Sequence, residues 1–144
     1  MIDRTFIDEL ASKAPTPGGG GASAYCGALA AALSSMVCNL TLGKAAYAAV
    51  QEEVQDCCDQ LGALIDHLIE LVEEDAKAFA PLAAAYSMPR ETPEEQRAKE
   101  EALQTALIAA CDVPLSIMQT CARVIELAEV LAEKGSRMAL SDTG

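Results

Sequence analysis

Residues 15–43 read PTPGGGGASAYCGALAAALSSMVCNLTLG. Two prolines fix φ and four consecutive glycines permit almost any φ, so we expect a break at residues 15–21 with no helix continuing through it. Residues 22–42 then carry no charged side chain, and small side chains recur along them. Small residues at helical spacing let another helix approach closely. The segment predicts a buried helix over residues 22–42 that ends near Gly43.

The same uncharged run is long enough to span a bilayer. About half of its residues are Ala, Gly or Ser, which insert into a membrane only weakly. The polar side chains of Asn39 and Thr41 make insertion less favourable still. No cluster of Lys or Arg flanks it. A helix inside a protein core therefore fits the run better than a membrane span, and we expect no membrane partner.

The rest of the chain has a helical hydrophobic pattern, and no stretch alternates like a strand. We expect helices over residues 3–13, about 45–86 and 93 to about 133. In the second of these, apolar residues recur in steps of three and four and form one continuous stripe. The stripe comprises positions 50, 54, 57, 61, 64, 68, 71, 72, 79 and 82.

Local signals mark the ends and bends of these helices. Residues Thr92–Glu95 have the pattern of a capping box with proline in the first turn. Pro81 and Pro114 lie inside helical patterns and are expected to kink them. Gly135 is expected to end the last long helix. The tail, residues 136–144, has no predicted partner element.

The predicted fold class is all-α, an up-and-down bundle of four to five long helices in one domain over residues 1–144. Helices of about 40 residues are too long for a lone globule of this size. We therefore expect self-association to complete the bundle, with a homodimer as the default symmetry.

Composition excludes several classes of protein. The chain is 51% hydrophobic but contains only two Phe, three Tyr and no Trp, so the core must consist of Ala, Leu, Val and Ile. The formal net charge of −12 argues against binding to duplex nucleic acid or anionic lipid, both of which require a basic face.

Six cysteines and one histidine occur without a C-x-x-C motif, so we expect no metal site. Most of these cysteines fall at apolar helical positions, where Cys behaves as a small hydrophobic residue. Residues 1–14 carry alternating charges rather than a secretory signal. Free thiols in a reducing cytoplasm are the simplest expectation.

Charges are distributed unevenly along the chain. No carboxylate occurs from Leu10 to Gln51, whereas nine occur from Glu52 to Asp75. A helix N-terminus directly after the glycine run would present unpaired N–H groups to an anion such as a carboxylate or phosphate. The alternative is a flexible turn between helices.

Asp75 stands where the apolar stripe predicts a hydrophobic residue, four positions after Leu71 and four before Phe79. A charge on a core-facing position is costly unless it is paired or used in function. Asp75 is therefore a candidate site residue. The alternatives are that it reaches solvent at the edge of the stripe or pairs with Lys44, Lys77 or Arg90.

The glycine run is the first of a series of short motifs that extends along nearly the whole chain. The series comprises PTPGGGGAS at 15–23, NLTLGK at 39–44, Tyr47, DAKAF at 75–79, AYSMPR at 85–90, Pro114 and Ser141-Asp142. It resembles the folate-dependent cyclodeaminase/cyclohydrolase family. Arg90 stands where family members usually have lysine, and the family domain normally continues past the Ser-Asp motif with further helices.

This resemblance implies an all-helical, dimer-forming enzyme acting on reduced folates without a cofactor. Its implied reaction here is hydrolysis of 5,10-methenyltetrahydrofolate to 10-formyltetrahydrofolate. The alternatives are release of ammonia by a formiminotetrahydrofolate cyclodeaminase and an inactive helical binding or dimerisation module. The implied site consists of catalytic Asp75 and Lys44 and substrate-binding Pro17, Gly18, Gly19, Gly20, Ser23, Tyr47, Arg90 and Asp142.

Overall fold

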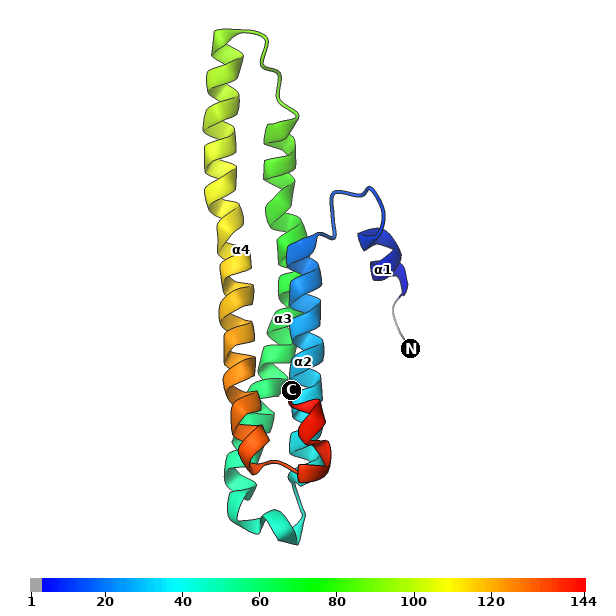
Figure 1. The fold of residues 1–144 in the computed structure, drawn as a ribbon. Coiled ribbons are helices and arrows are strands. Elements are labelled where there is room, and N and C mark those ends of the chain that lie inside the picture. Colours follow the sequence, from blue (N-terminus) through cyan, green and yellow to red (C-terminus); the bar gives the residue numbers. More distant parts are fainter. Residues whose placement is uncertain (1–3) are drawn as a thin grey trace.

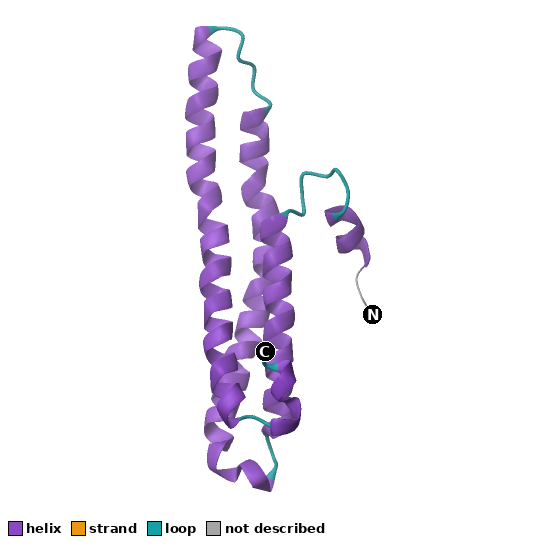
Figure 2. Ribbon diagram, viewed as in Figure 1, coloured by secondary structure: helices purple, strands orange, loops and turns teal. Residues whose placement is uncertain are grey.

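A computed structural model of the protein describes residues 4–144, and this range contains helices and connecting segments without any strand (Figure 2). The elements in chain order are α1 (Arg4–Leu10), α2 (Gly19–Thr41), the 3-10 helix η1 (Ala45–Val50), α3 (Gln51–Tyr86), α4 (Pro93–Lys134) and the 3-10 helix η2 (Arg137–Asp142). The predicted all-α class is confirmed.

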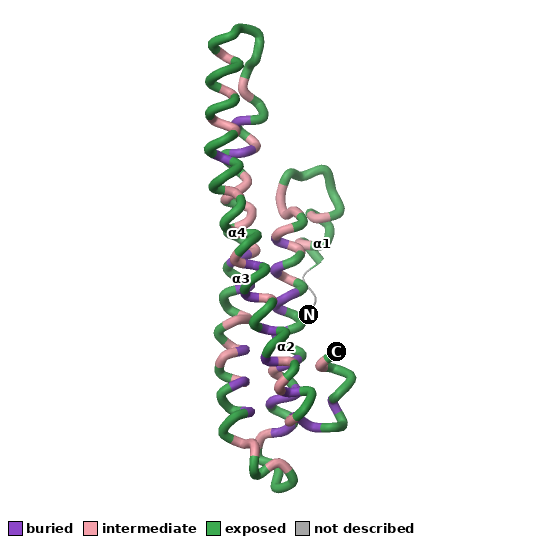
Figure 3. The backbone as a smooth tube through the Cα atoms, turned by 60° about the vertical axis from the view of Figure 1, so that its left-hand side comes forward, coloured by how far each residue is buried: buried purple, intermediate pink, exposed green. Residues whose placement is uncertain are grey.

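Helices α2, α3 and α4 run up and down beside one another, and α3 and α4 extend together beyond the start of α2 (Figure 1). This extension forms a two-helix arm that ends in the connection at residues 87–92. Most of the arm is exposed or half-buried (Figure 3). The short helix α1 lies to the side of the bundle, where Phe6 contacts Tyr25 of α2 with ring centroids 5.2 Å apart.

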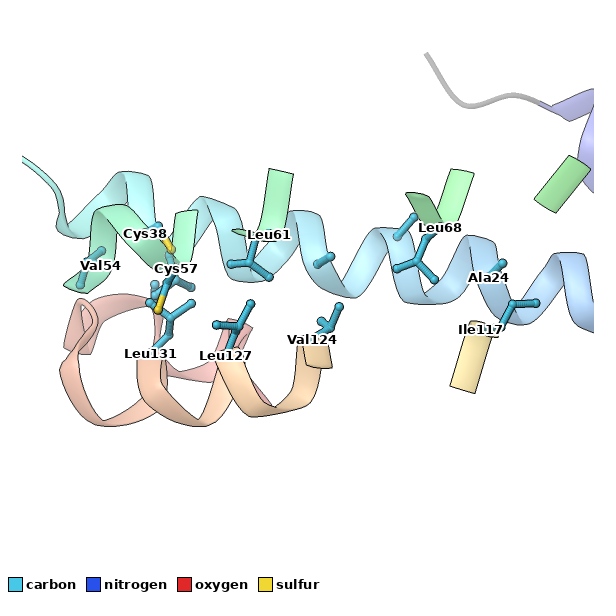
Figure 4. Close-up of a cluster of buried hydrophobic side chains, with 14 of the residues drawn as sticks. Ala24, Cys38, Val54, Cys57, Leu61, Leu68, Ile117, Val124, Leu127 and Leu131 are labelled. Atoms are coloured by element: carbon cyan, nitrogen blue, oxygen red, sulfur yellow. The ribbon is translucent and has the colours of Figure 1, made fainter. Parts of the chain in front are cut away.

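The core lies where the three long helices meet (Figure 4). Helix α2 contributes small side chains such as Ala24, Ala28 and Ala31, which let the larger side chains of α3 and α4 pack closely against it. The predicted stripe of α3 faces this core. Its buried members are Val54, Cys57, Leu61, Leu68, Leu71 and Leu82.

Among the predicted helix boundaries, the end of the first helix and the start of the third are wrong. Helix α1 ends at Leu10, and residue 3 of the predicted 3–13 helix lies outside the described residues. The long helix predicted from residue 45 begins at Gln51, because residues 45–50 form a 3-10 helix with Tyr47 outside helical geometry. The Gln51 side chain stabilises this turn by accepting from Gly43 N–H (2.7 Å) and donating to Tyr47 O (2.9 Å).

The tail was predicted to have no partner, and this is also wrong. Helix η2 packs against the end of α2, with Ala139 buried. Ser136 N–H donates a buried hydrogen bond to Thr41 Oγ1 at 2.8 Å, and Thr41 donates in turn to Val37 O at 2.7 Å. The contact depends on one backbone N–H and one hydroxyl, which leave no periodic signal in the sequence.

The predicted helix caps are confirmed. Thr92 and Glu95 form the reciprocal capping box at the start of α4. Gly135 is the C-cap of α4, and its N–H donates to Leu131 O at 2.8 Å. Gly43 follows α2 with φ of +73°, a value that favours glycine.

Helices α2 and α4 are long and apolar enough to cross a membrane by length and composition, a test that the core helix of a soluble protein also passes. In α2, 44% of the apolar window is buried inside the protein. In α4 the buried share is 17%.

Candidate active site

The first turn of α2 meets Asp75 of α3. Gly18 is the N-cap, and the helix begins at Gly19, inside the glycine run rather than at residue 22 as predicted. Gly21 N–H donates to Asp75 Oδ2 at 2.8 Å in a partly buried contact. A carboxylate is favourable there because the first N–H groups of a helix lack intrahelical partners and carry the positive end of its dipole.

The glycines allow this contact by lacking side chains. A Cβ at Gly20 would overlap the Asp75 carboxylate, and a Cβ at Gly21 would lie 3.5 Å from Val72 O. Gly20 thus lets α2 and α3 approach closely enough for Asp75 to cap α2. Within the run, close packing therefore requires glycine at residue 20, whereas a Cβ added at Gly18 or Gly19 would meet no atom within 4 Å.

The glycine run and Asp75 were separate candidates in the sequence, and the structure brings them together. The Asp75 carboxylate itself occupies the position at the start of α2 where we predicted a bound anion. No ion pair of Asp75 with Lys44, Lys77 or Arg90 is formed, within the described residues, and Lys77 pairs instead with Glu73. Asp75 is half-buried.

A cavity of about 310 Å³ opens beside this contact. Its seven lining residues are Gly19, Gly20 and Ser23 of α2, Asp75 of α3, and Pro114, Ile117 and Met118 of α4. The cavity thus has an apolar wall on one side and a single carboxylate on the other. An apolar lining with a few polar groups is typical of a small-molecule site.

Ile117 and Met118 were not predicted to be site residues. Both belong to an apolar helical pattern, which gives no signal distinguishing a cavity wall from a core position. Pro114 was noted as the residue expected to kink α4 and as one of the family motifs, but not as a site residue. Pro114 lines the cavity together with Met118, which lies about one turn later in α4.

Lys44 and Tyr47 lie at the opposite end of α2 from the cavity (Figure 1). The two ends of this 23-residue helix are about 33 Å apart at 1.5 Å per residue. Tyr47 faces the tail, and its Oη accepts a hydrogen bond from Arg137 N–H at 3.2 Å. This bond, followed by one involving Ser136, lowers the pKa of Tyr47 below its usual value.

This second end carries charges of both signs, since Glu133 lines the cavity there and Glu53 pairs with Lys134. Tyr47 lines a cavity of about 550 Å³ together with Lys134 and Arg137. Lys44 precedes η1 at its margin. The prediction that Lys44 and Tyr47 join Asp75 in one site is not met within a single chain.

The other predicted residues are also dispersed. Arg90 lies in the α3–α4 connection, where it lines a groove with Gln96 and Lys99. Asp142 is exposed at the end of η2. Pro17 and Gly18 immediately precede α2, and the Thr16–Pro17 peptide bond is cis.

One further polar group lies beside the α3–α4 contact. Ser116 Oγ is 3.5 Å from His67 Nε2, and His67 Nδ1 is 3.9 Å from Glu70 Oε2. Both distances are long for hydrogen bonds, and His67 is exposed. The arrangement is therefore too loose for a nucleophilic triad.

The protein is a helical bundle in which the Asp75 carboxylate accepts a hydrogen bond from the first turn of α2. A sequence model of the formiminotransferase-cyclodeaminase family matches residues 3–144, and the chain belongs to this family. The resemblance found in the sequence motifs is confirmed.

Individual relatives agree with this assignment. A methenyltetrahydrofolate cyclohydrolase from Methylorubrum extorquens is 46% identical over 140 residues, which are 97% of this chain and 67% of that protein. A formimidoyltransferase-cyclodeaminase from Rattus norvegicus is 34% identical over 139 residues, 96% of this chain and 26% of that protein. The crystal structure of formiminotetrahydrofolate cyclodeaminase from Thermotoga maritima has a TM-score of 0.85 and 31% identity, covering 99% of this chain and 67% of that one.

Proposed function

We propose that this chain is a tetrahydrofolate one-carbon enzyme that hydrolyses 5,10-methenyltetrahydrofolate to 10-formyltetrahydrofolate. The observation that carries the proposal is the 46% identity to a methenyltetrahydrofolate cyclohydrolase over 97% of the chain. The cavity beside Asp75 supports it, because this substrate is a flat ring system whose one-carbon bridge is cationic. We propose a homodimer in the cytoplasm as the acting form.

Asp75 is suited to two tasks in this reaction. Its negative charge stabilises the cationic bridge, and its carboxylate is a base for the attacking water. Because Gly21 N–H holds Oδ2 at 2.8 Å, the carboxylate keeps a fixed orientation toward the cavity. The apolar wall formed by Pro114, Ile117 and Met118 would pack against the ring and exclude bulk water.

Atoms and charge balance in the proposed reaction. A water oxygen bonds to the bridge carbon while one of its protons passes to Asp75, which gives a neutral tetrahedral adduct. The bond from this carbon to N5 then breaks, the hydroxyl proton passes to N5 as its oxygen becomes the formyl carbonyl on N10, and Asp75 releases the first proton to solvent. Neither step requires a metal or a redox cofactor, and we propose that none is used.

A cyclodeaminase is the second candidate. It is favoured by the Thermotoga maritima structure, with a TM-score of 0.85 over 99% of the chain. In that reaction N10 attacks the formimino carbon on N5 and ammonia leaves. The same carboxylate would then accept the N10 proton and return a proton to the departing nitrogen.

The absorbance of the methenyl substrate tests the first proposal. Purified protein should accelerate its loss over the buffer rate at neutral pH, and 5-formiminotetrahydrofolate should release ammonia more slowly. If ammonia release from 5-formiminotetrahydrofolate is the faster reaction, the cyclodeaminase becomes the first candidate. If neither substrate reacts and calorimetry shows no binding of a reduced folate, the chain is instead an inactive helical module or needs a partner subunit.

The chain covers 67% of the cyclohydrolase and 26% of the rat protein. We propose that residues 1–144 form a single helical domain of this family.

A further inference from the structure

Three of the six cysteines lie together where α2 packs against α3. Cys38 of α2 and Cys57 of α3 are core residues, 0% and 4% exposed (Figure 4). Cys58, the next residue of α3, is half-buried and packs against the edge of the same core. All three are free thiols, and the proposed reaction uses none of them. They are therefore nucleophiles outside the candidate active site.

Cys58 is the thiol of this cluster that is open to solvent. Its Sγ also lies 3.8 Å from Ser35 Oγ of α2, so the Ser35 hydroxyl can donate a hydrogen bond to a Cys58 thiolate. The thiolate is the reactive form of cysteine, and a hydrogen bond to the thiolate favours its formation. Cys58 is therefore the thiol that a small dissolved oxidant reaches first.

Cys38 lies beside Cys58 on the facing helix. Ser35 and Cys38 are three positions apart on α2 and so share one face of it. The Cys38 thiol itself makes a side-chain hydrogen bond with Cys58. Ser34, which is buried, and Ser35 are small residues, and small side chains let two helices approach as closely as a disulfide requires.

The three thiols differ in the chemistry open to them. Burial raises the pKa of Cys38 to about 12, so this thiol keeps its proton and reacts slowly with an oxidant by itself. Cys38 can still attack a neighbouring sulfur that is already oxidised. Cys57 is a poorer partner for Cys58, because consecutive residues of an α-helix point about 100° apart.

We propose that Cys58 and Cys38 form a reversible disulfide between α3 and α2 when the protein meets hydrogen peroxide. The Cys58 thiolate attacks one peroxide oxygen, the O–O bond breaks, and the hydroxide that leaves takes a proton from solvent. The Cys38 sulfur then attacks the sulfenic Cys58 sulfur, the S–O bond breaks, and the second hydroxide takes the Cys38 proton. Two thiols are oxidised to one disulfide, and one peroxide is reduced to two waters.

The disulfide would act as a redox-dependent lock on the α2–α3 contact. It closes the segment between residues 38 and 58, which contains the turn at Gly43 and the 3-10 helix η1, into a covalent loop. Closing a loop removes conformations from the unfolded chain, so the oxidised protein should be harder to unfold. This proposal does not rest on the proposed function.

Peroxide treatment of the native protein tests the pair. The remaining thiols are then alkylated in urea, and the peptides are mapped by mass spectrometry. Cys38 and Cys58 should be joined within one chain, and dithiothreitol should separate them. Cys58→Ser, which keeps a polar side chain beside Ser35, should leave Cys38 alkylated as a free thiol. Cys111→Ser, which removes an exposed thiol of α4, should leave the disulfide unchanged.

Urea unfolding measures the effect of the disulfide. The urea midpoint of the oxidised wild type should exceed that of the reduced protein by about 1 M or more. In Cys58→Ser, peroxide should produce no such rise. A wild type that shows the disulfide without a higher midpoint would contradict the proposed lock.

Three other results would overturn the pairing itself. In the first, peroxide converts Cys58 to a sulfinic or sulfonic acid while Cys38 remains a free thiol, which would place Cys38 out of reach of the oxidised sulfur. In the second, Cys57 takes the place of either thiol in the disulfide. In the third, Cys38 and Cys58 both stay free at a peroxide concentration that oxidises exposed Cys111, which would make the cluster inert.

Discussion

At the scale of single residues, Gly20 decides whether Asp75 can cap α2. Alanine in a helix is ordinarily more stable than glycine by about 1 kcal/mol. At Gly20 the added methyl group would overlap the Asp75 carboxylate, so the two helices would have to separate or the carboxylate would have to turn away. Gly20→Ala should therefore destabilise the protein, whereas a glycine-to-alanine change inside a helix usually stabilises it.

Gly20→Ala should lower the free energy of unfolding by about 1–3 kcal/mol, the range for a strained or overpacked site, and should slow turnover of the methenyl substrate. Gly62→Ala is the matched control, because Gly62 lies inside α3 and a Cβ added there would meet no atom within 4 Å. It should stabilise the protein by about 0.5–1 kcal/mol. Urea unfolding measures both variants. If Gly20→Ala stabilises the protein as much as Gly62→Ala does, Gly20 does not lie against the Asp75 carboxylate.

The buried thiol of Cys38 should make the protein less stable at alkaline pH. Burial, with the neighbouring Cys58 and Cys57 thiols, raises its pKa from 9.0 to about 12. Above pH 9 the unfolded thiol loses its proton while the folded one keeps it, so stability should fall as pH rises from 9 toward 12. Below pH 9 this contribution is constant.

The slope contributed by one such thiol approaches about 1.4 kcal/mol per pH unit. Urea unfolding under reducing conditions between pH 8 and 10.5 measures it. Cys38→Ala should flatten the dependence, whereas the exposed Cys111→Ala should follow the wild type. An unchanged slope in Cys38→Ala would exclude this thiol as the cause.

At the scale of elements, one hydroxyl joins η2 to α2. Thr41→Val keeps the shape of the side chain but leaves the buried Ser136 N–H without its acceptor. The expected loss is about 1–3 kcal/mol, with faster amide hydrogen exchange in residues 137–142. Thr105→Val is the control, because Thr105 is exposed and donates only to Glu101 O. If exchange in η2 is unchanged in Thr41→Val, other contacts hold the tail.

The elements themselves were largely predictable because their signals are local. The period of the α3 stripe, the capping box at Thr92 and the glycine at 135 each depend on residues a few positions apart. The start of α2 was misplaced because its cap, Asp75, comes from 54 residues away. The docking of η2 was missed for the same reason, since Ser136 and Thr41 are 95 residues apart.

Two features of the candidate site, Asp75 and the glycine run, could be singled out from the sequence, but their arrangement could not. Asp75 was marked by a charge inside an apolar stripe, and the glycine run by its composition. Met118 had no comparable mark, because an apolar residue on an apolar helix looks the same in a core or a cavity wall. The separation of Lys44 from Asp75 follows from the length of α2, which motif spacing alone does not express.

At the scale of the whole molecule, the acidic surface should make stability depend on salt. The ion pairs within residues 4–144 include a contact between Lys134 and Glu53 and four short-range pairs along helices, all of them at the surface. With a net charge of −12, screening should reduce repulsion more than it weakens these pairs.

The free energy of unfolding in urea should therefore rise as NaCl increases from about 10 mM to about 150 mM, across which the Debye length shortens from about 30 Å to about 8 Å. Neutralising exposed Asp59 and Asp66 should reduce the dependence. A protein that loses stability as salt is added would show that its ion pairs outweigh the repulsion.

The Asp75 carboxylate is the centre of the proposed mechanism, and a comparison of two variants tests its role most directly. The rate of methenyltetrahydrofolate hydrolysis is measured for the wild type, for Asp75→Asn and for Glu74→Gln, which neutralises the adjacent exposed carboxylate. Asp75→Asn should be slower by about 10²–10⁴-fold, as expected for loss of a positioned base, while Glu74→Gln stays close to the wild-type rate. An Asp75→Asn variant as fast as Glu74→Gln would contradict the assignment of the site.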